Sequence, residues 1–181
     1  MERKYHKIST QKEIEDSYKL SAIIREDGWI GKDTLIVNCS PDYSSIITQI
    51  LCHTLSDLNS NELFDVINLE MPYPVMNQIW NKETAEYELY DKYLLKWISK
   101  YISKDYIYLF VDSGTLRGKN FSKLKSVLRN KLDDKNFMFA SLYVQDDSIF
   151  TPDYYVEKFN FINQGGLLFE WENTLNPNWN Y

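Results

Sequence analysis

Runs of consecutive apolar residues alternate along this chain with longer segments in which apolar residues recur every three or four positions. The apolar runs lie at 34–37, 106–111 and 137–144. They are rich in β-branched and aromatic residues, which predicts strands that are buried on both faces. The periodic segments lie at 46–55, 83–103 and 121–132. Their spacing is that of one helix face, so the alternation predicts an α/β fold with a mostly parallel sheet flanked by helices.

The two ends of the chain add further elements. Thr10 and Glu13 have the spacing of a capping box, which predicts a helix from Thr10 to about Glu26 that ends before Gly28. Its apolar residues are Ile14, Tyr18, Leu20, Ala22, Ile23 and Ile24. Shorter strand candidates lie at 64–69, 152–157 and 167–171. Because the 181 residues contain no repeat or linker, we expect one domain over 1–181, with its core at 7–172 and a fraying tail at 173–181.

The longest predicted helix, at 83–103, carries a stripe of large apolar side chains. The stripe consists of Tyr87, Tyr90, Leu94, Trp97 and Tyr101, widened by Leu95 and Ile98. Such a stripe packs against a core or seats a partner helix. We favour the core, because the stripe is as wide as a core-facing helix requires.

The overall charge argues against nucleic acid as a partner. Lys and Arg number 20 against 26 Asp and Glu, for a net charge of −6, so no basic field surrounds the protein. A local basic cluster at 119–131 is followed directly by Asp133 and Asp134, as is typical of a solvated helix face. No apolar run approaches the ~20 residues of a membrane span, and no signal sequence is present, so we expect neither a membrane protein nor secretion.

Cysteine and histidine are scarce. Cys39 and Cys52 give neither a disulfide framework nor a metal-binding spacing, which fits a reduced, cytoplasmic setting. With His6 and His53 alone, the chain offers little for a histidine-based metal centre or triad. Cys39 follows a predicted strand, where nucleophiles occur, but no nearby His or Lys would lower its pKa, so we do not expect a catalytic thiol.

The segment 106–132 has the strongest functional pattern. Its apolar strand ends at Asp112, a short loop with Gly114 and Gly118 follows, and a helix then begins. Loop amides and the unpaired N–H groups of a first helical turn together form an anion site. An Asp at the carboxyl end of a strand lies where open α/β sheets bind ligands. We therefore predict a sugar-phosphate site here.

Two familiar phosphate motifs do not fit this segment. A P-loop needs four residues between its glycines and a Ser or Thr after the Lys, whereas Gly114 and Gly118 enclose three and Asn120 follows Lys119. A dinucleotide-binding fingerprint has a different glycine spacing, and it lies in an N-terminal unit.

The segment resembles the phosphoribosyl pyrophosphate (PRPP) motif of type I phosphoribosyltransferases. That motif is an apolar strand, two acidic residues, an aliphatic residue, two variable residues, and then Thr/Ser-Gly-x-Thr/Ser. Other stretches are similar to the hypoxanthine/xanthine-type branch and occur in the same order. They lie at 7–15, 32–37, 142–144, 152–156 and 169–172. The resemblance covers about residues 7–172 and implies a type I phosphoribosyltransferase-like fold.

The resemblance also implies roles for individual residues. Asp112 would hold the ribose hydroxyls as the catalytic acidic residue and would contact Mg²⁺, the implied cofactor. The loop after the earlier strand, with Ser40 and Asp42, would hold pyrophosphate. The remaining implied ligand-binding residues are Ser113, Gly114, Thr115, Leu116, Arg117, Gly118, Lys119 and Asn120.

The sequence departs from the family pattern mainly at polar positions. Ser113 replaces the second acidic residue, and Arg117 and Asn120 replace hydroxyl residues. Cys39-Ser-Pro-Asp42 stands where an Arg-Gly-Gly-type loop is usual, and Gln145 stands at a usual Lys. The apolar framework is retained while several ligand contacts are lost.

Two functions therefore stay open. The first is a purine-type phosphoribosyltransferase that binds PRPP or a purine nucleotide. The second is a catalytically impaired homologue that senses a nucleotide or serves as a regulatory or structural subunit. In that second case helix 83–103 would be the natural surface for a protein partner or a homodimer.

Overall fold

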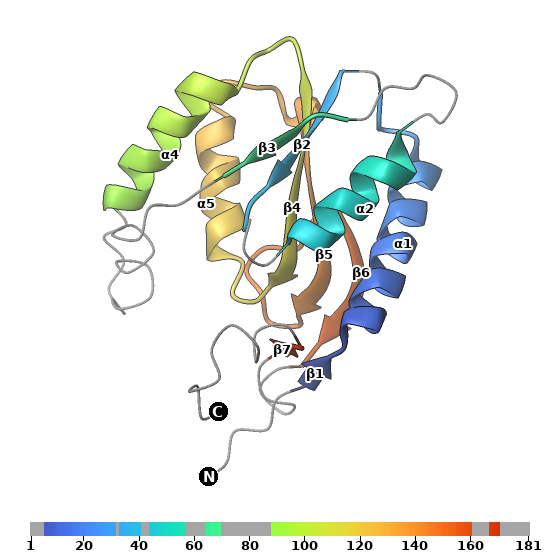
Figure 1. Cartoon of the computed structure of the whole chain (residues 1–181). Helices are drawn as coiled ribbons and strands as arrows, with labels where there is room; N and C mark the ends of the chain where they lie inside the picture. Colours follow the sequence, from blue (N-terminus) through green and yellow to red (C-terminus); the bar gives the residue numbers. More distant parts are fainter. Residues whose placement is uncertain are drawn as a thin grey trace.

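The computed structural model describes residues 6–31, 33–40, 44–56, 64–69, 88–160 and 167–170. Its main sheet has five strands in the order β3-β2-β4-β5-β6, and every neighbouring pair is parallel (Figure 1). The strands are β2 (Thr34–Asn38), β3 (Val66–Asn68), β4 (Ile107–Thr115), β5 (Phe137–Gln145) and β6 (Tyr154–Phe159). The predicted parallel α/β sheet is confirmed. The predicted tail at 173–181 lies outside the described residues.

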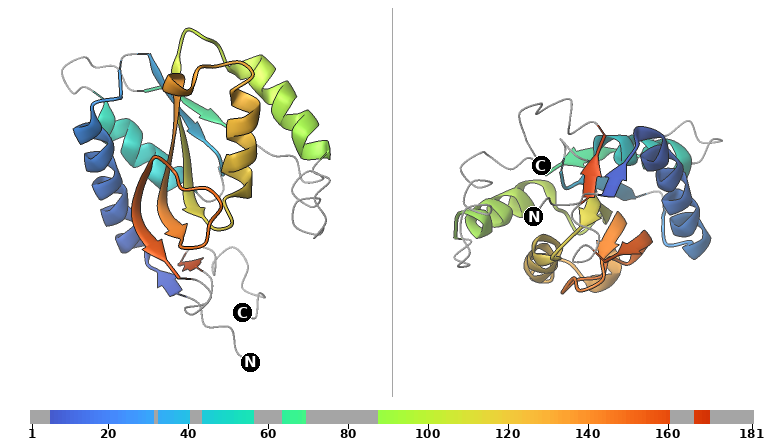
Figure 2. Two further views of the ribbon diagram at one scale, coloured as in Figure 1. Left: turned by 180° about the vertical axis from the view of Figure 1, so that it is seen from behind. Right: turned by 90° about the horizontal axis from the view of Figure 1, so that it is seen from below.

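Helices cover both faces of this sheet (Figure 2). The helices are α1 (Thr10–Asp27), α2 (Ser45–Leu55), α4 (Glu88–Tyr101) and α5 (Lys119–Leu128), with a short 3-10 helix, η1 (Asp134–Asn136), before β5. Side chains of a strand alternate between its faces. Accordingly, Tyr108 and Phe110 of β4 pack with α4 and α5, while Leu109 and Val111 pack with α1 and α2. Strand β4 thus contributes to both halves of the core.

A second, two-stranded parallel sheet lies beyond the carboxyl ends of the main strands (Figures 1 and 2). It pairs β1 (His6–Ile8) with β7 (Leu167–Phe169). The ring of Phe169 lies 6.0 Å from that of Tyr143 on β5, so the small sheet is packed onto the main one. The sequence predicts the strand near 167–171, but β1 is too short for a period of two to be visible.

Strand β4 is longer than the apolar run predicted. Its pairing with β5 continues past Val111 through Asp112, Gly114 and Thr115. The predicted loop at 112–118 is therefore wrong in extent, and the segment between β4 and α5 is 116–118. An apolar run marks where a strand is buried, whereas backbone pairing determines where it ends.

The predicted N-terminal helix is confirmed, but two details differ. Its N-cap is Ser9, whose hydroxyl accepts a hydrogen bond of 3.1 Å from the Lys12 N–H, rather than Thr10. Of its apolar residues, Leu20 and Ile24 are buried, whereas Tyr18 is 56% exposed. The residues that α1 buries are Glu13, Asp16, Ser17, Leu20, Ser21 and Ile24.

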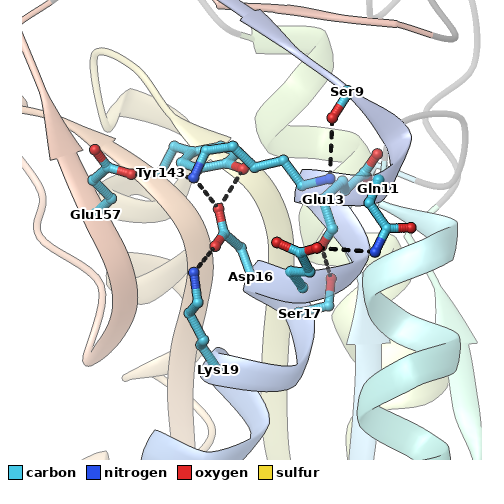
Figure 3. A network of polar contacts seen from close by, with 10 residues as sticks. Ser9, Gln11, Glu13, Asp16, Ser17, Lys19, Tyr143 and Glu157 are labelled. Carbon is cyan, nitrogen blue, oxygen red and sulfur yellow. Dashed lines mark hydrogen bonds and ion pairs between the residues drawn. The ribbon is translucent and has the colours of Figure 1, made fainter.

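Asp16 explains why α1 buries polar residues (Figure 3). Its carboxylate is fully buried and accepts hydrogen bonds from Lys12 (2.7 Å), Lys19 (2.6 Å) and the hydroxyl of Tyr143 on β5 (2.8 Å). Burial alone would raise the pKa of Asp16, but these three bonds outweigh it and hold the pKa below its usual value. The network ties α1 to the centre of the sheet.

The part of helix 83–103 that the structure describes, α4, packs against the core. Leu94, Trp97 and Ile98 are buried, and the Trp97 indole N–H donates a 3.2 Å hydrogen bond to the Asn68 carbonyl at the end of β3. The prediction of core packing is confirmed for these residues, whereas Tyr101 is 41% exposed. Among the described helices, none has both the length and the apolar character needed to cross a bilayer.

Candidate functional site

The strand order reverses direction between β2 and β4, so the carboxyl ends of these strands are the candidate site. From β2 the chain moves to β3 on one side, and from β4 it moves to β5 on the other. Open α/β sheets bind ligands in the crevice outside such a switch point. Here the Cys39 N–H donates a 2.9 Å hydrogen bond to the Val111 carbonyl, and the Ser40 hydroxyl donates one of 3.2 Å to the Asp112 carboxylate. The structure thus brings together two of the predicted site residues, Ser40 and Asp112.

The pKa of the Asp112 carboxyl is raised in the folded protein. Its burial raises its pKa to about 6, although hydrogen bonds from the Ser113 N–H (2.7 Å) and the Ser40 hydroxyl act in the opposite direction. At neutral pH the group is mostly ionised and acts only as a hydrogen-bond acceptor. Such a carboxylate is suited to binding ligand hydroxyls.

Cys39 directly follows β2, next to Ser40, and is not an activated thiol. It is 6% exposed, and its pKa lies well above the ordinary value because of burial and the nearby Asp112 carboxylate. Its S–H donates to the Val37 carbonyl over 3.7 Å. The thiolate is the nucleophilic form, so these surroundings agree with the prediction that Cys39 is not catalytic.

The residues described here do not by themselves form a metal site. No group of three or more His, Cys, Asp and Glu side chains within the described ranges is placed to hold an ion. Mg²⁺ prefers octahedral oxygen ligands and is commonly held by one or two carboxylates together with substrate phosphates and water. Asp112 supplies one carboxylate, so Mg²⁺ would depend on oxygens from the ligand.

The N-terminus of α5 has the features of an anion site. Gly118 is its N-cap residue, with φ 71° and ψ 4°, and no side chain caps the helix. Arg117 and Lys119 flank it, and neither side chain has a hydrogen bond or ion pair to another described residue. Unpaired first-turn amides and two free cations favour an anionic ligand at this point.

Thr115 has an unpartnered hydroxyl on the strand face that it shares with Leu109 and Val111, opposite α5. Its hydroxyl is buried and has no hydrogen-bond partner among the described residues. Thr115 is 4% exposed, and it ends β4 three residues before the N-cap of α5. A buried hydroxyl without a partner costs about 1–3 kcal/mol, so such groups usually have a water or ligand as partner.

The turn before α5 is held by a segment that sequence reasoning did not find. The Ile149 N–H donates a 3.3 Å hydrogen bond to the Arg117 carbonyl. A Cβ on Gly118 would lie 2.5 Å from Ser148 Oγ and 2.7 Å from the backbone N of Phe150. The Phe150 ring in turn packs against Phe121, with centroids 5.7 Å apart. No local pattern predicts this contact, because it joins two loops that are distant in sequence.

The remaining predicted site residues differ in where the structure places them. Ser113 and Gly114 lie within β4 and are not part of a loop, because pairing with β5 continues through this part of the strand. Leu116 and Asn120 are exposed on either side of Gly118. Asp42 lies outside the described residues.

Comparison with known proteins identifies the fold. No protein-family model and no curated protein matches this sequence. The xanthine-guanine-hypoxanthine phosphoribosyltransferase of Helicobacter pylori superposes with a TM-score of 0.61 at 16% identity, covering 97% of each chain. A purine phosphoribosyltransferase from Pyrococcus horikoshii gives 0.55 at 17% identity, covering 91% of this chain and 93% of that one. The protein therefore has the type I phosphoribosyltransferase fold.

A third similar structure is not described as a phosphoribosyltransferase. It is a hypothetical protein from Neisseria gonorrhoeae with bound ppGpp, with a TM-score of 0.61 at 13% identity over 95% of this chain and 92% of that one. All three identities are low, so these likenesses concern the fold, and function has to be argued from the site.

Proposed function

We propose that this protein binds a phosphorylated ribose compound, PRPP or a purine nucleotide, at the carboxyl edge of its main sheet. The 5′-phosphate lies at the N-terminus of α5, between Arg117 and Lys119. The ribose hydroxyls lie against Asp112. Mg²⁺, where it takes part, arrives with the phosphates of the ligand and contacts Asp112.

The N-terminus of α5 carries this proposal. The helix has no side-chain cap, and Arg117 and Lys119 flank its first turn without a hydrogen bond or ion pair to another described residue. A helix N-terminus alone attracts anions only weakly, and exposed cations alone are common on protein surfaces. Here both occur at one turn, which favours a phosphate more than either feature does alone.

Asp112 supports the sugar part of the proposal. Its carboxylate lies at the switch point and accepts hydrogen bonds from the hydroxyls of Ser40 and Ser113 and from the backbone N–H groups of Ser113 and Gly114. Ribose hydroxyls would share its lone pairs with these donors. The Ser113 side chain cannot contribute a second carboxylate.

Purine phosphoribosyl transfer is the second candidate. The similar structures from H. pylori and P. horikoshii are phosphoribosyltransferases, and the one from N. gonorrhoeae holds ppGpp. Loss of pyrophosphate from PRPP needs stabilisation of the departing negative charge. The described residues near Ser40 include no cation for that purpose. We therefore place nucleotide binding ahead of turnover.

Calorimetric titration tests the binding proposal. We expect GMP or IMP to bind the wild-type protein, and Asp112→Asn to weaken that binding about tenfold, as expected when a charged hydrogen-bond acceptor becomes neutral. Glu15→Gln, an exposed change on α1, serves as the control and should leave the affinity unchanged. A turnover assay with PRPP, Mg²⁺ and guanine, hypoxanthine or xanthine then separates the enzyme from the binding protein. Failure of every ribose phosphate to bind would contradict the proposal.

A further inference from the structure

We propose that the outer surface of helix α4, together with the turn that follows it, binds single-stranded nucleic acid. This surface, the lysine row, is not part of the candidate nucleotide site. The expectation that nucleic acid is not a partner rests on the net charge of the whole chain, which does not show how the charges are distributed. The lysine row consists of Lys92, Lys96 and Lys100 on α4, with Tyr101, Lys104 and Tyr106 at its end.

The charges of the chain are segregated along its sequence. Residues 92–131 contain 10 of the 20 Lys and Arg residues but only 2 of the 26 Asp and Glu residues, Asp105 and Asp112, which gives a net charge of +8. The rest of the chain has 10 basic and 24 acidic residues, a net charge of −14. Helices α4 and α5 cover the same face of the main sheet (Figures 1 and 2). An acidic protein therefore has one strongly basic layer.

The lysines of α4 form a row because they recur every four residues. Lys92, Lys96 and Lys100 are all exposed, and this spacing places their side chains next to one another on one face of the helix. A helix rises about 1.5 Å per residue, so these side chains are attached about 6 Å apart along the helix axis. Such a row can follow an extended chain of phosphates.

The positive charge of the lysine row has little compensation from the described part of the chain. Neither Lys96 nor Lys104 makes a hydrogen bond or ion pair to another described residue. The exposed acidic residue beside them, Asp105, accepts a 2.7 Å hydrogen bond from the Ser103 hydroxyl. Like charges four residues apart destabilise a helix, so the row has a cost in the isolated protein. A bound polyanion would remove that repulsion.

Two exposed tyrosines among these cations favour nucleic acid over other polyanions. Tyr101 is 41% exposed and Tyr106 is 42% exposed, and the Lys100 ammonium lies 4.7 Å from the centroid of the Tyr101 ring. Single-stranded nucleic acid is bound by cations that contact its backbone and by aromatic rings on which its bases stack. A membrane needs a broad apolar face, whereas Leu95 is the only exposed large aliphatic residue among those described on α4. An acidic protein would use the cations but has no bases to stack on the rings.

Fluorescence anisotropy tests the proposal on the full-length protein. The probe is a labelled single-stranded RNA of about 20 nucleotides and mixed sequence, longer than the site of a typical single-strand-binding domain. If about four lysines contact phosphates, the logarithm of the affinity falls with that of the salt concentration at a slope of about −2.8. We therefore expect binding at about 200 mM salt to be roughly 50-fold weaker than at about 50 mM. Absence of RNA binding at the lower salt concentration would overturn the proposal.

A triple variant and a charge-matched control locate the binding surface. In Lys96→Gln/Lys100→Gln/Lys104→Gln we expect the affinity for RNA at low salt to fall at least about tenfold and the salt slope to become shallower by about 2. The control replaces three exposed cations on β1, α1 and β6 with the same change in net charge: Lys7→Gln/Arg25→Gln/Lys158→Gln. It should leave the affinity and the slope unchanged. Equal losses in the two variants would mean unspecific attraction and would overturn the proposal.

The tyrosines are tested separately from the charges. Tyr101→Leu and Tyr106→Leu leave every charge in place, so each should weaken RNA binding about tenfold while the salt slope stays the same. Full affinity in both variants would contradict the assignment to nucleic acid. Tighter binding of polyglutamate, or of vesicles that contain phosphatidylserine, than of RNA at the same salt concentration would also overturn it, in favour of an acidic protein or a membrane.

The inference and the proposed function can fail separately. Lys96, Lys100 and Lys104 lie outside the candidate nucleotide site, so the triple variant should bind GMP as the wild-type protein does. A protein that binds GMP and no RNA overturns the inference alone. A protein that binds RNA and no ribose phosphate overturns the proposed function alone.

Discussion

The hydroxyl of Ser40 donates a 3.2 Å hydrogen bond to the carboxylate of Asp112, across 72 positions in sequence. This contact joins the carboxyl ends of β2 and β4, the two strands from which the chain leaves in opposite directions. It therefore marks the switch point at which this class of sheet binds ligands. In the proposed complex, the ribose hydroxyls share the lone pairs of Asp112 with this bond and the other protein donors.

The raised pKa of Asp112 predicts a pH-dependent stability in the absence of ligand and metal. Folding favours the protonated carboxyl, because its pKa rises from 3.8 to about 6. The associated stability is present below about pH 4 and is lost as the pH rises through 6. Asp112→Asn removes the charged form, so we expect it to stabilise the protein at pH 8, by up to about 2–3 kcal/mol, and to be nearly neutral at pH 3. Urea unfolding at both pH values measures the effect of the substitution on stability. An equal effect at the two pH values would contradict the raised pKa of Asp112.

Gly118 should be intolerant of a side chain for two separable reasons. Its φ of 71° is costly for other residues, and an added Cβ would lie 2.7 Å from the backbone N of Phe150. We expect Gly118→Ala to destabilise the protein by at least about 2 kcal/mol and to abolish nucleotide binding, because Arg117 and Lys119 would shift with the turn.

Two other glycines provide matched controls for that variant. Gly28 has a similar φ of 69° with no atom within 4 Å of an added Cβ, so Gly28→Ala measures the backbone cost alone. Gly31→Ala places its Cβ 4.0 Å from Ile107 and should be nearly neutral. If Gly118→Ala cost no more than Gly28→Ala in thermal or urea unfolding, the close contact with Ser148 and Phe150 would not hold the turn.

The Asp16 network should contribute to stability and not to ligand binding. Asp16→Asn takes a charged hydrogen-bond acceptor from the Tyr143 hydroxyl, Lys12 and Lys19, so we expect it to cost about 1.5–3 kcal/mol at pH 7. Because the pKa of Asp16 is lowered on folding, its contribution is present above about pH 4 and is lost as the pH falls through its folded-state pKa. Urea unfolding between pH 3 and 7 checks both statements. Glu15→Gln on the exposed face of α1 should change stability by less than about 0.5 kcal/mol.

The sequence predicts the sheet better than it predicts the contacts between its elements. The runs 34–37 and 137–144 are confirmed as β2 and β5, because continuous apolar character marks a strand buried on both faces. The local pattern of α1 does not predict that Asp16 is buried, where Lys12, Lys19 and Tyr143 donate hydrogen bonds to it. A bond to Tyr143, 127 residues away, leaves no trace in a local periodic pattern.

The same limit applies to the candidate site. The helix N-terminus at 119, the glycine at 118 and the acidic residue at 112 are visible in the sequence, because each has a local conformational or chemical requirement. The extension of β4 through Gly114 follows from pairing with Tyr143, and the support from Ile149 follows from a contact between two loops. Neither is encoded in local spacing.

The central claim is that a phosphate binds at the N-terminus of α5, and one titration tests it most directly. GMP is titrated by calorimetry into the wild-type protein, into the double variant Arg117→Ala/Lys119→Ala, and into Lys104→Ala. Lys104 is an exposed cation next to the amino end of β4, at the opposite edge of the sheet. We expect the double variant to lose about 100-fold in affinity, since each hydrogen-bonded charge contributes roughly 1.5–3 kcal/mol at most, and Lys104→Ala to bind as the wild type does. Equal affinity in all three proteins would contradict the claim.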